Sequence, residues 1–180
     1  MKSHIETDAG YFESATCDLD AFTLLIDQTA NASTVPNADH IQKNVPIYDM
    51  QRLRPWLEDK EQRRTIMAEW GRVLRTGAGV LVLRGAYEDT VVLDEATAIY
   101  EKIIATEKLA SGGGGDHFAA SGSNDRIWNS LQKLCEEAPS LFLRYFANTS
   151  IAAACEAWLG PNYQMTAQIN LVHPGGAAQQ

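Results

Sequence analysis

One run of residues near the C-terminal end of the sequence, 164–171, alternates strictly between polar and apolar side chains. This alternation is typical of a half-buried strand, and it places Gln168 and Asn170 on the same face. The apolar face must pack against other elements, and a stable sheet usually needs at least three strands. We expect one other strand, over residues 79–85, because this segment is rich in Val, bounded by glycines and apolar enough to be buried. These strands by themselves predict an incomplete sheet.

The clearest helix is expected to begin near Glu58 and to end at Gly77. Ile66, Trp70 and Val73 fall on one stripe with a period of 3.6 residues. Acidic residues lie in the first turn and basic residues in the last, where each complements the helix dipole. A glycine directly after the last turn is a common helix terminator.

Further helices are expected toward the C-terminal end. One spans about 89–109, and its predicted buried face consists of Leu93, Ala96, Ile99, Tyr100, Ile103 and Ile104. Others are predicted near 126–137 and over about 150–159. The last of these has Thr149 or Ser150 as its cap and Ile151, Cys155 and Trp158 as its apolar stripe. Gly160 and Pro161 end it. The predicted fold class is therefore α+β.

The domain organisation is predicted to be an N-terminal arm over residues 1–45, followed by one domain over 46–180. The arm is rich in polar residues and carries one short amphipathic piece at 21–26.

The charge balance excludes some classes of partner. The formal net charge is -8, from 23 acidic and 15 basic residues. This argues against a nucleic-acid binder and against electrostatic docking on anionic lipid. No apolar run approaches the length of a membrane helix, so no membrane partner is expected. The three cysteines form no CxxC pair, which favours reduced thiols and a cytoplasmic location.

Candidate binding residues lie around the glycine run at 112–115. The run lacks the spacing of a phosphate-binding loop, so it is either a flexible linker or a mobile loop beside a ligand, with His117 and Phe118 at its edge. Arg126 either clamps a carboxylate bidentately or lies on the surface of a helix capped by Asn124 or Asp125. Trp128 is a further candidate for substrate contact.

The amides of Gln168 and Asn170 also leave two interpretations open. They are unremarkable if their strand face is solvated, and they are ligand-binding groups if it lines a barrel interior. We identify no catalytic residue and no metal ligand; His173 is expected to be a turn residue.

Read in order, several of these segments resemble the phytanoyl-CoA dioxygenase family. The resemblance runs over about 60–180, through the strand at 79–85, the turn at Gly160-Pro161-Asn162-Tyr163, the strand through Gln168-Ile169-Asn170 and the turn at His173-Pro174-Gly175. It implies the first strands of a jelly-roll barrel (a double-stranded β-helix) preceded by helices, apparently incomplete at residue 180.

The resemblance also implies iron(II) and 2-oxoglutarate as cofactors of the complete enzyme. It assigns Arg126, Gln168 and Asn170 to the cosubstrate pocket and the loop over 112–124 to the substrate. It places the iron-binding His-x-Asp after residue 180, so this chain is expected to bind no iron and to be inactive. The expected substrate is a small organic or lipid-like molecule. The alternative is a mostly helical binding or scaffold protein that pairs its terminal strand with a partner.

Overall fold

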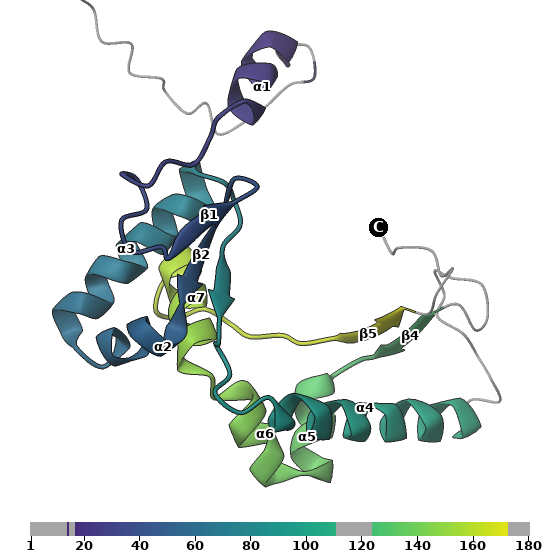
Figure 1. Cartoon of the computed structure of the whole chain (residues 1–180). Helices are drawn as coiled ribbons and strands as arrows, with labels where there is room; N and C mark the ends of the chain where they lie inside the picture. The colour runs from purple at the N-terminus through teal and green to yellow at the C-terminus, as the bar shows by residue number, and fades with distance from the viewer. Residues whose placement is uncertain (1–13, 15–16, 111–123, 173–180) are drawn as a thin grey trace, which may run out of the picture.

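The computed structural model describes residues 14, 17–110 and 124–172, which form a mixed helix-and-strand fold (Figure 1). The predicted α+β class is confirmed, whereas the jelly-roll barrel stays a prediction. The described residues pack around two separate hydrophobic cores, called here the α3 core and the α4 core. None of the described helices is both long enough and apolar enough to cross a membrane.

The helices and strands before residue 111 are α1 (Leu19–Ile26), β1 (His40–Gln42), β2 (Val45–Asp49), α2 (Met50–Leu53), the 3-10 helix η2 (Arg54–Leu57), α3 (Lys60–Thr76), β3 (Val82–Arg84) and α4 (Val91–Ala110). Those after residue 123 are β4 (Asn124–Ile127), α5 (Ser130–Glu137), α6 (Pro139–Phe146), α7 (Thr149–Leu159) and β5 (Ile169–Val172).

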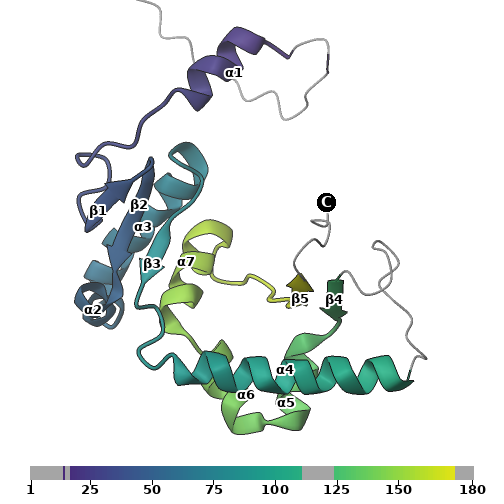
Figure 2. The ribbon, with the colours of Figure 1, turned by 45° about the vertical axis from the view of Figure 1, so that its right-hand side comes forward.

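The described strands form two sheets. β1, β2 and β3 form a three-stranded sheet in which β1 is antiparallel and β3 parallel to β2, whereas β4 and β5 form an antiparallel pair. β1 lies inside the predicted N-terminal arm, so the end of that arm joins the sheet. Figure 2 shows the β4–β5 pair beside α4, away from the three-stranded sheet.

The strand expected over 79–85 is shorter and more exposed than predicted. β3 spans only Val82–Arg84, and the side chain of Val82 is 42% exposed. Its burial alternates along the strand, because only one face of the sheet contacts the α3 core. The expectation of a fully buried strand is therefore wrong.

α3 forms where the sequence predicts it, because its local signals agree. The Oδ1 atom of Asp59 accepts hydrogen bonds from the amides of Glu61 (3.1 Å) and Gln62 (2.9 Å), which caps the first turn. Ile66 and Trp70 of the predicted stripe lie in the α3 core, where the Trp70 ring packs edge-on against Tyr48 at 5.8 Å. Val73 is also buried. The helix ends at Gly77, where a Cβ would lie 3.0 Å from backbone atoms of Val73.

α7 packs against α3 through small residues instead of its predicted stripe. Ile151 is 40% exposed and Trp158 is 46% exposed, whereas Ser150 and Ala153 are buried. The predicted stripe is wrong because the two helices approach closely at Gly71. A Cβ there would lie 3.0 Å from the carbonyl oxygen of Ala157 in α7.

The cap of α7 also differs from the prediction by one residue. The Oδ1 atom of Asn148 accepts hydrogen bonds from the amides of Ser150 and Ile151, both at 3.0 Å. Its Nδ2 donates to the carbonyl oxygen of Ala86 at 2.9 Å. Asn148 thus joins the start of α7 to the segment between β3 and α4. This link is made by the Asn148 side chain and not by the predicted caps Thr149 or Ser150.

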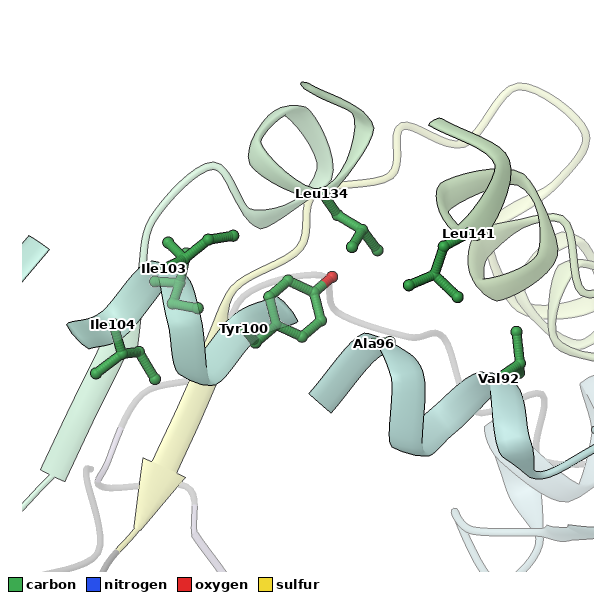
Figure 3. Close-up of a cluster of buried hydrophobic side chains, with 8 residues drawn as sticks. Val92, Ala96, Tyr100, Ile103, Ile104, Leu134 and Leu141 are labelled. Atoms are coloured by element: carbon green, nitrogen blue, oxygen red, sulfur yellow. The ribbon is translucent and has the colours of Figure 1, made fainter. Parts of the chain in front are cut away.

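The α4 core lies between α4, α5 and α6 (Figure 3). Ala96, Tyr100, Ile103 and Ile104 supply the predicted buried face of α4, and Leu134 and Leu141 meet them from α5 and α6. Burial, together with the nearby hydroxyl of Tyr145, raises the pKa of the Tyr100 hydroxyl to about 12. Tyr100 is therefore neutral at physiological pH.

The helix predicted near 126–137 begins only at Ser130. Asn124–Ile127 is the strand β4, and Ile127 is fully buried in the α4 core. The backbone of Asn129 adopts the left-handed conformation (φ 54°) between the strand and α5. β4 forms because it pairs with β5, so the interpretation of Asn124 or Asp125 as a helix cap is wrong.

Candidate functional site

The β4–β5 pair brings together three of the residues named from the sequence. In its antiparallel register, Arg126 lies opposite Asn170 and Ile127 lies opposite Ile169. Residues opposite each other share one face of the pair, and successive residues alternate between faces. Arg126 and Asn170 therefore point to one side of the β4–β5 pair, and Ile127 and Ile169 point to the other, toward the α4 core.

Two contacts with described residues orient the guanidinium group of Arg126. Its Nε donates a hydrogen bond of 2.9 Å to Oδ1 of Asn170. Its central carbon lies 5.1 Å from the centre of the Trp128 ring, within the range of a cation–π interaction. A guanidinium held by an amide and an aromatic ring is suited to bind a carboxylate in a defined orientation.

Trp128 is half exposed, so its ring is available to a ligand beside Arg126. Large aromatic surfaces of this kind bind apolar or planar groups and gain from their burial. The combination of a cation and an exposed ring favours a small organic anion as the ligand of this site.

Gln168 is not joined to this group by a hydrogen bond between described residues. It is exposed and lies directly before β5, which spans only Ile169–Val172. The strand predicted over 164–171 is therefore wrong in its first part, because residues before 169 have no strand opposite them among the described residues. His117, Phe118 and His173 lie outside the described residues.

An ion pair not predicted from the sequence fixes β4 against α4. Nζ of Lys108 lies 2.7 Å from Oδ1 of Asp125, and the Asp125 side chain is almost fully buried. A buried carboxylate needs such a partner. The sequence shows both residues, Lys108 at the end of α4 and Asp125 directly before Arg126. It does not indicate that they pair, because the pairing depends on the strand β4, which the sequence does not predict.

A second polar cluster lies at the edge of the three-stranded sheet. Nη2 of Arg84 lies 3.1 Å from Oδ2 of Asp39 and 2.9 Å from Oδ2 of Asp49, and Nδ1 of His40 lies 2.9 Å from Asp39. The hydrogen bond from Arg84 holds the pKa of Asp49 below its usual value. The hydrogen bond from His40, and secondarily Arg84, does the same for the pKa of Asp39. Because Arg84 pairs with both carboxylates, the cluster is a structural ion-pair network.

The described residues contain no group of three or more His, Cys, Asp or Glu side chains that could hold a metal ion. The carboxylate of Asp125, which is nearest in sequence to Arg126, is paired with Lys108. The described residues around Arg126 therefore fit an organic anion.

Comparison with known proteins adds no assignment to this geometry. No family model matches the chain, and no curated protein or solved structure is significantly similar to it. The β4–β5 pair, with Arg126, Trp128 and Asn170, is thus defined as a candidate site by its own contacts.

Proposed function

We propose that this chain belongs to an iron(II)- and 2-oxoglutarate-dependent dioxygenase that hydroxylates a small organic or lipid-like substrate. Arg126 binds a carboxylate of 2-oxoglutarate and Asn170 orients the guanidinium. The observation that supports this role is the 2.9 Å contact between Arg126 Nε and Asn170 Oδ1 across the β4–β5 pair. The resemblance to the phytanoyl-CoA dioxygenases assigned both residues to the same pocket.

Trp128 contacts the substrate or the cosubstrate chain in this proposal, since its exposed ring lies against Arg126. The resemblance adds Gln168 to the cosubstrate pocket, and His117 and Phe118 stay sequence-based candidates for substrate contact. Iron would supply oxygen activation in the complete enzyme, but the resemblance places its ligands after residue 180. The proposal therefore gives this chain a binding role and no oxidative step. The proposed location is the cytoplasm, in keeping with free thiols at Cys135 and Cys155.

Calorimetric titration with 2-oxoglutarate tests the cosubstrate site. We expect binding that R126Q weakens about tenfold, because charge-assisted hydrogen bonds to a carboxylate contribute about 1.5–3 kcal/mol. R64Q is the matched control, since Arg64 is an exposed arginine of α3 whose nearest carboxylate partner, Glu61, lies at 3.8 Å. Equal affinity of the parent chain and R126Q would overturn the assignment.

Iron(II) titration with measurement of succinate release tests the absence of an oxidative step. We expect no succinate from this chain with 2-oxoglutarate and iron. Tight binding of one iron per chain, with turnover, would contradict the proposal that the ligands lie elsewhere.

The second candidate function is a binding or scaffold protein that adds a partner strand to β5. Two observations favour it. Asn170, Leu171 and Val172 are exposed, and β4 is the one described strand that pairs with β5, so the other edge of β5 has no described strand beside it. Size-exclusion chromatography separates the two candidates. A well-behaved dimer with no response to iron or 2-oxoglutarate favours strand addition.

A further inference from the structure

A cavity of about 680 Å³ lies between the end of α1, the segment that follows it and the C-terminal end of α3. Its volume falls in the range of cavities that bind small molecules, about 300–1,000 Å³. It is formed by a different part of the chain from Arg126 and the β4–β5 pair, so nothing that follows depends on the proposed function.

The wall of this cavity is held in place by Asn44. This residue lies in the turn between β1 and β2 with a left-handed backbone (φ 69°). Its Nδ2 donates a 2.9 Å hydrogen bond to the carbonyl oxygen of Gln28, and its Oδ1 accepts one from the amide of Ala30. One side chain thus attaches the segment after α1 to the sheet.

Apolar side chains from three parts of the chain face the cavity. Leu25 and Ile26 come from the last turn of α1, Val35 from the following segment and Val73 from α3. The side chains of Leu25 and Ile26 are each 60% exposed, whereas Val35 and Val73 are buried. The α1 wall therefore offers apolar surface that a ligand would remove from water, which is favourable.

The charge of the cavity comes from one residue. Arg72 is the one charged side chain among the described residues that line it. Arg72 forms no ion pair with any described residue, unlike Arg63 and Arg64 on the same helix. Several polar lining groups already have partners: Asn44 as above, Thr34 with the carbonyl oxygen of Asn31, and Thr76 with that of Arg72.

We propose that this cavity binds an amphipathic carboxylate, with its apolar body between α1 and Val73 and its head group at the Arg72 guanidinium. Apolar walls with one cation and no described anion select a ligand with the opposite charge on an apolar chain. The Glu69 carboxylate, one turn before Arg72, is not part of the lining and is bound by Asn37 and Tyr48.

The C-terminal end of a helix carries partial negative charge, which would oppose an anion. Here two carbonyl groups near the end of α3 have partners. The carbonyl oxygen of Arg72 accepts from the amide of Gly77 (3.1 Å), and that of Val73 accepts from the amide of Gly79 (2.9 Å). These two carbonyl groups are therefore directed to backbone amides, and Arg72 supplies the one full charge among the described lining residues.

Titration of the isotopically labelled full chain with decanoate, followed by NMR, tests the proposal. We expect amide shifts centred on the end of α1 and the end of α3. R72Q weakens decanoate binding about fivefold, as removal of one exposed ion pair predicts. R75Q is the matched control, because Arg75 is exposed on the same helix, carries the same charge and does not line the cavity. Equal effects of R72Q and R75Q would overturn the role of Arg72.

A second pair of variants tests the apolar wall. I26S removes exposed apolar surface that lines the cavity, and L24S removes similar surface from α1 that does not. We expect I26S to weaken decanoate binding about fivefold and L24S to leave it unchanged. Neither variant removes a buried side chain, so both are expected to fold. Equal binding by the two variants, or no decanoate binding by the parent chain, would overturn the proposal.

Two other occupants of the cavity, an uncharged apolar molecule and a second copy of the chain, are distinguished by related experiments. 1-Decanol, which has the apolar chain without the charge, is expected to bind the parent chain and R72Q equally. If the cavity binds a small molecule, light scattering is expected to show no dimer of the parent chain that depends on Ile26 and is dissociated by I26S. A dimer that I26S dissociates and L24S does not, without decanoate binding, would assign the cavity to a second copy of the chain instead.

Discussion

The hydroxyl of Tyr48 donates a 2.9 Å hydrogen bond to Oε1 of Glu69, and both side chains are fully buried in the structure. Oε2 of the same carboxylate accepts from Nδ2 of Asn37 at 2.7 Å. A buried carboxylate is tolerated only when donors surround it. These donors come from β2 and from the end of the N-terminal arm, so Glu69 joins both to α3.

The Y48F variant is expected to lower the free energy of unfolding by about 2 kcal/mol, because it removes a hydrogen bond to a buried charged group. Chemical denaturation measures the change. Y163F is the matched control, since Tyr163 is half-buried and its hydroxyl has no hydrogen-bond partner among the described residues. Equal stability losses in the two variants would contradict the importance of the Glu69 contact.

The close approach of α3 and α7 at Gly71 predicts a steric effect. G71V is expected to lower the free energy of unfolding by about 1–3 kcal/mol, because its side chain meets the carbonyl oxygen of Ala157. A68V places the same side chain on the exposed face of α3 and is expected to cost about 0.5 kcal/mol or less. Thermal denaturation compares them, and a G71V variant as stable as A68V contradicts the packing described.

The ion pairs of Arg84 predict how stability depends on pH. The pKa of Asp49 is below 3.8 in the folded chain, chiefly through its hydrogen bond with Arg84. A lowered folded pKa adds stability above the unfolded pKa, and this contribution is lost as the pH falls through the folded value. The melting temperature of the parent chain should therefore fall more steeply than that of R84Q between about pH 5 and about pH 3.

R64Q serves as the control for this pH dependence, because it removes the same charge from an exposed site on α3. It should retain the steep acid branch of the parent chain. Parallel curves for the parent chain and R84Q would show that Asp49 gains nothing from Arg84.

The contact between Arg126 and Asn170 predicts coupling between the two strands. A double-mutant cycle of R126Q and N170A should give a coupling energy of about 0.5–1 kcal/mol, the range for an exposed polar contact. Replacing N170A by N162A gives the control cycle, because Asn162 is exposed and makes no hydrogen bond to Arg126. Zero coupling with N170A would mean that the strands do not hold Arg126 in the manner described.

Local signals in the sequence determined several elements by themselves. Acidic residues in the first turn, a single apolar stripe and a following glycine predict α3, and each acts within a few residues, so no distant contact is needed. The same holds for α4, whose predicted buried face is the one that packs against α5 and α6. The mixed fold class follows from these elements.

The tertiary structure decided the features that depend on distant partners. The segment Asn124–Ile127 has no alternation typical of a strand, and it becomes one because Ile169–Val172 lies beside it. The buried face of α7 is set by the space that Gly71 leaves on α3, which outweighs the larger side chains of Ile151 and Trp158. Of the described partners of Arg126, Trp128 directly follows β4, whereas Asn170 lies on β5 and is 44 residues away in the chain. A hydrophobic pattern is a property of residues that are neighbours in the sequence, so the sequence predicts it. Strand pairing and close helix packing are properties of two distant segments, so they are known only from the tertiary structure.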